Sequence, residues 1–320
     1  MGSFPRAVYK QAVPYPQATW TILILYHRMS EEGITSVPSV AIVTDSVADL
    51  PPQVAEEFGI TIVPLVLRFG TDIYLDGLDL SPDEFYEKLK TSKILPVTSV
   101  SSPAAFADAY DKLAEKTNEI VVISLSKKLS GVYQVALQAV GLMKKQCRVD
   151  VLDSQWAVMA QGFIVIAAAK AAQAGASLDE VLDVARQTIH RVDMRAAFDT
   201  LEYLERGGRI GKAQAFLGSL LKINPVIGMK DGEVHPYARE RSRAKAIDHL
   251  YNFAASFGDV EGLAVEYATD LDEANSLVQR LHSKYPQVPI YLSRATPVIG
   301  THTGPSLILV SVFGIGQVGT

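Results

Sequence analysis

Short apolar runs alternate with segments of helical pattern from Val40 to about residue 153. Four runs are typical of buried strands: Val40–Val43, Ile60–Leu67, Ile120–Leu125 and Val149–Leu152. The segments between them predict helices over 50–58, from Ser81, from about Pro103 and over 131–143, whereas 72–77 is polar and rich in turn residues. Strands that alternate with helices predict an α/β fold with a parallel, doubly wound sheet.

The regular alternation of strand and helix patterns ends after about residue 160. Helical patterns dominate to Arg195, and two apolar runs around Asp231-Gly232 then predict a β-hairpin. Further helices are predicted over 243–257 and 271–285, and strands over 262–267, 290–292 and 307–313. Hairpins mixed with helices favour an α+β second domain with antiparallel strands. We therefore expect an extension over 1–38, an α/β domain over 39–160 and an α+β domain over 161–320.

Composition describes an ordinary soluble globular protein. Of the 320 residues, 48% are hydrophobic and 20% are charged, and the net charge of −5 argues against a general nucleic-acid binder. Cys147 stands alone, which excludes an internal disulfide and a cysteine-built metal site and fits a reducing, cytoplasmic compartment. The most apolar helical run, Trp156–Ala169, is short and interrupted by Gln161 and Gly162, so a buried core helix is expected rather than a membrane span.

The segment Leu201–Gly211 carries the most chemical information. A helical start ends in Gly207-Gly208, and Arg209 follows. Paired glycines allow a close backbone approach, and a guanidinium suits a carboxylate or phosphate. The alternative is a helix C-cap followed by a solvated arginine. A further helical stretch is predicted over 212–222.

Three polar clusters are expected at the carboxyl ends of strands, the sheet edge where ligands bind in open α/β folds. They are Thr44-Asp45-Ser46, Thr98-Ser99 and Ser124–Gly131. Hydroxyls beside a helix N-terminus form an anion site, with Ser99 well placed for that role, although each hydroxyl could simply cap a helix. His302 is predicted in a turn of small polar residues and glycine before the last strand. It joins the site if Ser99 and Arg209 converge with it on one anion.

Other motifs narrow the chemistry. No two histidines have metal-ligand spacing, so a metal site is not expected. A nucleotide-phosphate loop and a hydrolase nucleophile elbow are both missing from the sequence. Arg239, Arg241, Arg243 and Lys245 form either a solvated face or a basic surface for a phosphate-bearing partner.

Together these motifs resemble the DegV family, the fatty-acid-binding proteins that include the FakB subunit of bacterial fatty acid kinase. The resemblance spans about residues 40 to 314 in order. The matching segments are Thr44–Leu50, Pro64-Leu65, Tyr74–Gly77, Thr98-Ser99, Leu129–Tyr133, Val151–Ser154, Leu201–Gly211, Lys222–Pro225, Asp231-Gly232, Ala238–Arg241 and His302–Pro305.

The resemblance implies a two-domain fold that holds a long-chain fatty acid in a buried tunnel between the domains. Ser99 and His302 would hold the carboxylate, with Thr98 beside them and Arg209 near the mouth. The other residues expected around the site are Asp45, Ser46, Ser130, Gly131, Thr303 and Gly304. A separate ATP-dependent kinase would phosphorylate the carboxylate, with Arg241 on its docking side.

The chain would then be a carrier, with no catalytic residue, cofactor or metal of its own. Its partners would be the fatty acid and the kinase, without nucleic acid or membrane insertion; any contact with a membrane surface would be transient.

Three positions depart from the family pattern. Val100 stands where glutamine is frequent, and Val132 stands where threonine is frequent. Arg68 takes the place of a hydroxyl residue that helps to bind the carboxylate in some members. Arg68 either points inward and clamps the head group, or projects to solvent and leaves the site one donor short.

Two other functions compete with the carrier. One is a stand-alone phosphoryl or acyl transferase that uses Asp45, Ser99 and His302. The other is a regulatory module in which a bound lipid only fills the structure.

Overall fold

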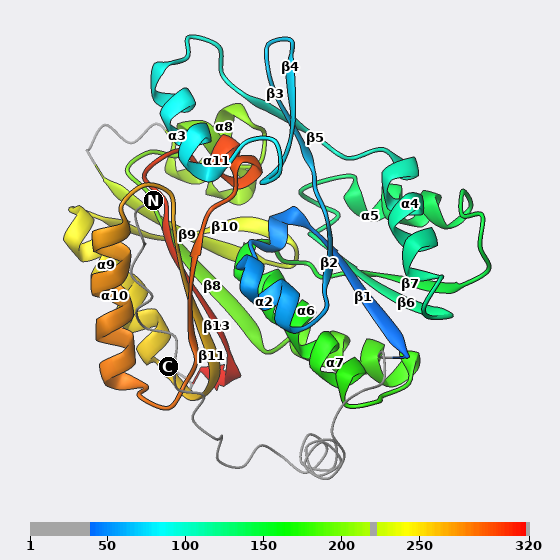
Figure 1. The fold of residues 1–320 in the computed structure, drawn as a ribbon. Coiled ribbons are helices and arrows are strands. Elements are labelled where there is room, and N and C mark those ends of the chain that lie inside the picture. The colour runs from blue at the N-terminus through cyan, green and yellow to red at the C-terminus, as the bar shows by residue number, and fades with distance from the viewer. Residues whose placement is uncertain (1–38, 218–222, 318–320) are drawn as a thin grey trace, which may run out of the picture. The chain divides into compact units, whose positions relative to one another are not determined.

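A computed structural model of the chain describes residues 39–217 and 223–317, so the predicted extension over 1–38 lies outside the described residues. Three sheets organise the described chain (Figure 1). The order of helices and strands along the chain confirms a mixed α/β fold. The proposed domain boundary at residue 160 stays a prediction; it falls within the central helix α6 (Val158–Gln173).

Sheet A is parallel, as the alternating pattern predicts. Its strands, in spatial order, are β2 (Thr61–Val63), β1 (Val40–Asp45), β6 (Glu119–Ser124) and β7 (Arg148–Asp153). Consecutive residues of β6 enter different cores: Ile120 and Val122 pack in one cluster, Val121 and Ile123 in another. This alternation follows from the two-residue period of a strand and places helices on both faces.

Helices cover sheet A on both sides. Those of the first half are α2 (Pro52–Glu57), α4 (Pro103–Leu113) and α5 (Val132–Val140), and α7 (Leu178–Ile189) follows α6. Figure 1 shows α4 and α5 on one face and α6 with α7 on the other. Thirteen of the 16 residues of α6 are buried, which explains its apolar sequence and confirms a core helix.

Sheet D is mostly antiparallel. Its spatial order is β10 (Glu233–Glu240), β9 (Asn224–Lys230), β8 (Val192–Ala197), β13 (Ile308–Gln317), β11 (Phe257–Tyr267) and β12 (Ile290–Arg294). Only the β11–β12 pair among these neighbours is parallel. Helices α9 (Arg243–Ala255) and α10 (Leu271–Lys284) pack on one face. The predicted Asp231-Gly232 hairpin joins β9 and β10, and both turn residues have positive φ, as a type I′ turn requires.

The third sheet is small and lies beside three short helices. Sheet B has the order β4 (Asp72–Leu75), β3 (Val66–Phe69) and β5 (Val97–Ser99). The helices are α3 (Pro82–Thr91), α8 (Glu202–Arg206) and α11 (Pro297–Thr303). Ser81 caps α3 with Glu84 in a full capping box, which confirms the helix start predicted there.

Two predictions for residues 60–77 were wrong. The single strand expected over Ile60–Leu67 breaks at Pro64-Leu65 into β2 and β3, which belong to different sheets. Pro64 has no N–H for a ladder, and its carbonyl accepts a hydrogen bond from the Ser101 hydroxyl instead. The turn-rich segment over 72–77 begins with strand β4, because β3 supplies a partner that its polar sequence does not reveal.

Three further predictions need correction. The helical pattern expected to Arg195 ends at Ile189, and residues 192–197 form β8 between β9 and β13. The stretch predicted as a helix over 212–222 begins as the short 3₁₀-helix η2 (Gly211–Phe216), and residues 218–222 lie outside the described residues. His302 lies in helix α11, not in a turn, because Pro297 is compatible with the first turn of a helix.

Candidate functional site

A large cavity lies between the carboxyl end of sheet A and one face of sheet D. This inner cavity has a volume of about 980 Å³, including space open to solvent. Of its 26 lining residues, 18 are apolar, two are glycines and six are polar. Val47 follows β1 and Leu125 follows β6, so both come from strand ends where ligands bind in open α/β sheets.

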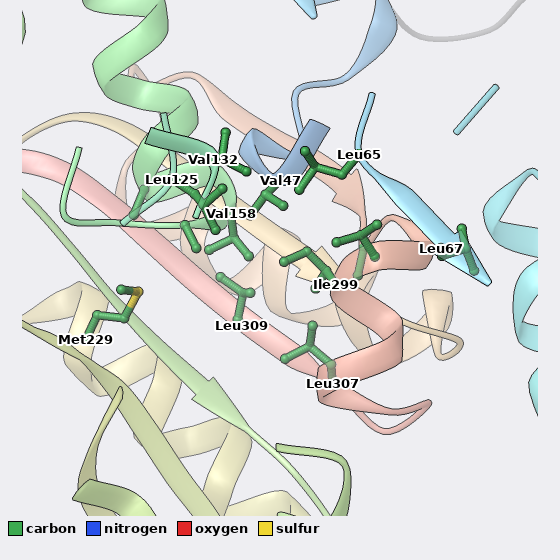
Figure 2. Close-up of a cluster of buried hydrophobic side chains, with 14 of the residues drawn as sticks. Val47, Leu65, Leu67, Leu125, Val132, Val158, Met229, Ile299, Leu307 and Leu309 are labelled. Carbon is green, nitrogen blue, oxygen red and sulfur yellow. The ribbon is translucent and has the colours of Figure 1, made fainter. Parts of the chain in front are cut away.

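The opposite wall is a row of paired residues across sheet D. Ile227, Ala196 and Leu309 are paired side by side on β9, β8 and β13. All three line the inner cavity. Figure 2 shows apolar side chains converging on this region from η1 (Ser46–Ala48), from the start of α6 and from α11 and β13. The lining is therefore assembled from segments far apart in the sequence.

The cavity has six polar lining residues. They are Thr98, Ser99, Ser130, Arg209, His302 and Thr303. The Thr98 hydroxyl lies 2.7 Å from Nε2 of His302, and Arg209 donates from Nε to the carbonyl of Leu129, the neighbour of Ser130. The cavity thus combines an apolar body with one group of hydrogen-bonding side chains. No acidic side chain lines it among the described residues.

His302 is held in a neutral form. Burial, and then the nearby Arg209 charge, lower its pKa from 6.5 to about 4. Its Nδ1 atom is buried without a hydrogen-bond partner, against the backbone of Gly207. A neutral ring carries one N–H, so with the proton on Nε2 it donates to Thr98 and leaves the threonine hydrogen free for a ligand.

Arg209 takes part in the helix C-cap and also lines the inner cavity. Helix α8 ends in a Schellman motif, in which Arg209 donates its N–H to the carbonyl of Leu204 and Gly208 donates to Glu205. Gly208 has φ +69°, the left-handed conformation that this cap requires. The guanidinium is then fixed by the carbonyls of Leu129 and Gly207 at 3.1 and 2.7 Å. The cap therefore aims the charge at the cavity.

Several other predicted residues also reach the cavity, and some do not. Ser130, Gly131 and Thr303 line it, and Ser99 is exposed at its edge. Arg68 projects from the exposed face of sheet B and is not among the lining residues, so of its two alternatives the structure has the outward one. Gly304 ends α11 against the Tyr203 ring, and Arg241 is exposed beyond β10.

Asp45 and Ser46 serve the fold next to the cavity and do not line it. The Asp45 carboxylate accepts hydrogen bonds from the backbone N–H groups of Leu125 and Val47 and from the Gln161 side chain. Burial raises its pKa to about 6. Ser46 accepts from the N–H of Leu65. Of the three residues that a transferase would use, Ser99 and His302 line the cavity and Asp45 does not.

Three buried carboxyl groups that the sequence reading missed support α11 and α6. Asp49 accepts from the N–H of Thr296, Asp76 from that of Val298, and Glu266 from that of Met159. Burial raises the pKa of Asp76 to about 6 and of Glu266 to about 8, and burial beside Glu266 raises the pKa of Asp49. The sequence shows only that these residues are Asp and Glu, whereas tertiary packing determines that they are buried.

A second, outer cavity of about 690 Å³, including space open to solvent, adjoins the polar group. Thr98, Arg209 and His302 line both cavities, and Arg206 lines only the outer one. Sequence reasoning missed Arg206, although it stands three residues before Arg209. Within 39–217 and 223–317, no cluster of side chains could hold a metal ion, and no helix is long and apolar enough to cross a bilayer.

Comparison with known proteins agrees with this architecture. A family model described as DegV, an uncharacterised protein family, matches residues 39–314. The chain belongs to the DegV family. A DegV domain-containing protein from Halalkalibacterium halodurans is 37% identical over 276 residues, covering 85% of this chain and 97% of that protein. The protein DegV of Bacillus subtilis is 34% identical over 273 residues, covering 83% and 96%.

Solved DegV structures share the fold. The DegV crystal structure from Bacillus subtilis, described as a fatty acid binding protein, has a TM-score of 0.80 and 32% identity, with 87% of this chain and 100% of that chain covered. A DegV family protein from Thermus thermophilus, described by its fatty acid binding, gives 0.79 and 32% with the same coverage. A stearic acid-binding protein from Eubacterium ventriosum gives 0.78 and 27%, covering 86% and 98%.

Proposed function

We propose that this chain binds a long-chain fatty acid in the inner cavity, with the carboxylate at Thr98, Ser99, His302 and Arg209. The observation that carries the proposal is an apolar cavity with six hydrogen-bonding residues in its lining and no acidic lining residue among those described. Fatty acid binding by solved DegV relatives supports the same assignment.

The acyl tail supplies most of the affinity. Burial of a methylene group contributes about 0.8 kcal/mol, so a sixteen-carbon tail gains on the order of 10 kcal/mol before ordering costs. The apolar wall across β9, β8 and β13 offers the surface for this burial.

The polar group orients the ligand. A carboxylate is an acceptor with four lone pairs and needs donors in a partly buried site. The Ser99 and Thr98 hydroxyls and the Arg209 guanidinium offer them, and the neutral His302 ring orients the Thr98 hydroxyl toward the ligand. Arg209 is already held by two carbonyls, so little side-chain entropy is lost when the acid binds.

We further propose that the chain is a carrier that presents the carboxylate to a separate ATP-dependent kinase in the cytoplasm. The carboxylate oxygen would form a bond to the γ-phosphorus of ATP, and the bond from that phosphorus to ADP would break. The outer cavity beside His302 gives the reacting oxygen a route outward. Because the sequence has no nucleotide-phosphate loop, the phosphoryl donor is assigned to the partner.

The first test is mass spectrometry of the purified chain, native and then after organic extraction. A stoichiometric long-chain fatty acid that exchanges with labelled acid supports the carrier. A protein that is empty and takes up no added fatty acid overturns it. ATP-dependent turnover of fatty acid by the purified chain alone would favour the transferase, and bound acid that never exchanges would favour the regulatory module.

A further inference from the structure

Two buried acids hold the first turn of α11. Asp49 accepts a hydrogen bond from the N–H of Thr296 at 3.3 Å, and Asp76 accepts one from the N–H of Val298 at 3.0 Å. Both acids come from the first half of the chain, and they are 2% and 3% exposed. Because α11 has only seven residues and His302 is the sixth, the position of the imidazole depends on how this first turn is held.

A third buried acid holds the start of α6. The Glu266 carboxyl group accepts from the N–H of Met159 at 2.9 Å. Val158, directly before Met159, lines the inner cavity and has φ +54°, a left-handed conformation that strains a β-branched residue. Glu266 is also paired across sheet D with Leu309, another lining residue. Glu266 therefore supports two segments of the cavity wall.

Asp49 and Glu266 satisfy each other only when they share a proton. Their carboxyl groups are hydrogen-bond partners, yet Oδ2 of Asp49 and Oε2 of Glu266 are buried without a donor. Ionised carboxylates only accept hydrogen bonds, so a bond between two of them requires that one is protonated. Burial raises both pKa values, that of Glu266 to about 8, and the neighbouring Glu266 raises that of Asp49 further.

The other ionisable groups around these acids do not replace that proton. Arg294, from β12, forms an ion pair with Asp83. The pKa of Tyr86, from α3, is raised well above its ordinary value by burial, so the phenol stays neutral. Asp45, before η1, is bonded to backbone N–H groups. The first turns of α6 and α11 contain no ionisable side chain. Loss of the shared proton therefore leaves two negative charges side by side in the protein interior, where they repel strongly.

We propose that Asp49, Asp76 and Glu266 are positioning residues that clamp α11 and the start of α6 around a bound fatty acid, and that the proton shared by Asp49 and Glu266 keeps this clamp closed. The inference rests on the proposed function, because the clamp controls release of that ligand. Loss of the proton separates the two acids, loosens the first turn of α11 and moves His302 away from Thr98. Release of the fatty acid is therefore faster at alkaline pH.

The test is the rate at which the full chain releases a fluorescent fatty acid into an excess of palmitate, measured from pH 6.5 to 9. Wild-type release should be at least about fivefold faster at pH 9 than at pH 6.5. The pKa of His302 is lowered to about 4, so its ring is neutral throughout this range. Ionisation of the ligand itself is the same for every variant.

Glu266→Gln should reduce this pH dependence to less than about twofold, because the amide supplies the hydrogen that the shared proton provides and still accepts from the N–H of Met159. Asp49→Asn makes the same change from the other side of the pair and should have the same effect. The control is Glu56→Gln, which is exposed on α2, lies outside both cavities and should keep the wild-type slope. A merely structural role would not change the pH profile in this way.

A variant at Asp76 tests the grip on α11 at a single pH. Asp76→Ala removes the acceptor for the N–H of Val298 and should speed release at pH 6.5 at least about threefold. Asp76→Asn keeps an acceptor oxygen and should release the ligand at close to the wild-type rate. Equal rates for Asp76→Ala and the wild type would remove this residue from the clamp.

Other outcomes separate the clamp from the proposed function. A wild-type release rate that does not vary with pH, or a wild-type slope in Glu266→Gln, overturns the clamp and keeps the fatty acid site. Infrared spectroscopy of the wild-type chain needs no variant to fold: a protonated-carboxyl band present at pH 6.5 should disappear by pH 9, and its absence at both pH values also overturns the clamp. Failure of the wild-type chain to bind any fatty acid overturns both.

Discussion

The imidazole of His302 packs directly against the backbone of Gly207. A Cβ atom added at Gly207 would overlap Nδ1 of the ring. The two residues are 95 positions apart in numbering, and they meet because α8 and α11 lie side by side at the polar end of the inner cavity. The observed position of His302 therefore requires a glycine at position 207.

Gly207→Ala should weaken fatty acid binding about tenfold, which corresponds to about 1.4 kcal/mol. Gly207 has a helical φ of −73°, so alanine strains no backbone angle, and the atom closest to the added Cβ is Nδ1 of His302. The control is Gly141→Ala, where the added atom meets nothing closer than 3.6 Å. Unchanged affinity with an intact fold would remove the contact from the site.

Ser99→Ala and His302→Ala should each reduce fatty acid affinity about three- to tenfold, because the first removes a donor to the carboxylate and the second removes the ring that orients the Thr98 hydroxyl toward it. Neither change should unfold the protein, since Ser99 is exposed and His302→Ala gives up a single hydrogen bond, the one between Nε2 and Thr98. His282→Ala, on the exposed side of α10, is the control. Wild-type affinity in both site variants would contradict the assigned head-group position.

Ala196→Leu should shift the extracted acids toward shorter chains. Ala196 is buried at the centre of the sheet D wall and faces the inner cavity, so the added carbons take space from the tail. Because that space is not filled by protein, melting temperature should change little, unlike overpacking of a dense core, which costs about 1–3 kcal/mol. Ala244→Leu adds the same atoms on exposed α9 and should leave the acyl profile unchanged. A destabilised protein with the wild-type profile would argue against the cavity.

Stability should fall as pH rises from about 4.5 to about 8. Burial raises the pKa of Glu266 from 4.5 to about 8, so folding favours its protonated form. The stabilisation is complete below about pH 4.5 and is lost as pH passes through about 8. The pKa of Asp49 is also raised, by burial, by the neighbouring Glu266 and by the negative charge of Asp76.

Glu266→Gln should flatten this pH dependence of melting temperature, because an amide does not titrate and can still accept from the N–H of Met159. Glu56→Gln, exposed on α2, should keep the wild-type slope. A variant at position 266 that keeps the slope would assign the pH dependence to other groups.

Arg241→Ala should leave fatty acid affinity unchanged and reduce acyl phosphate formation with a fatty acid kinase by at least about fivefold. Arg241 is exposed and lines neither cavity, so its charge is available to a partner. Arg186→Ala is the comparison for loss of one exposed charge. Reduced lipid binding by Arg241→Ala would contradict the separation of binding from docking.

Local signals predicted much of the fold. The apolar runs located β1, β6 and β7, and the capping residues located the start of α3. Asp231-Gly232 predicted its hairpin because the turn chemistry is contained in two residues. By contrast, β4 and β8 were missed, since their sequences become strands only when neighbouring strands offer hydrogen bonds.

The sequence by itself determined which chemical groups are available: hydroxyls at Thr98 and Ser99, the glycine pair before Arg209, and a histidine near the last strand. It also carried enough motifs to indicate the DegV family. Tertiary structure alone decided that Arg68 points outward and that Arg206 lines a second cavity. It also decided that the Asp45 carboxylate accepts backbone hydrogen bonds within the fold. The reason is physical: a motif specifies side-chain type and local backbone, whereas burial and the direction of a side chain depend on packing between segments distant in the chain.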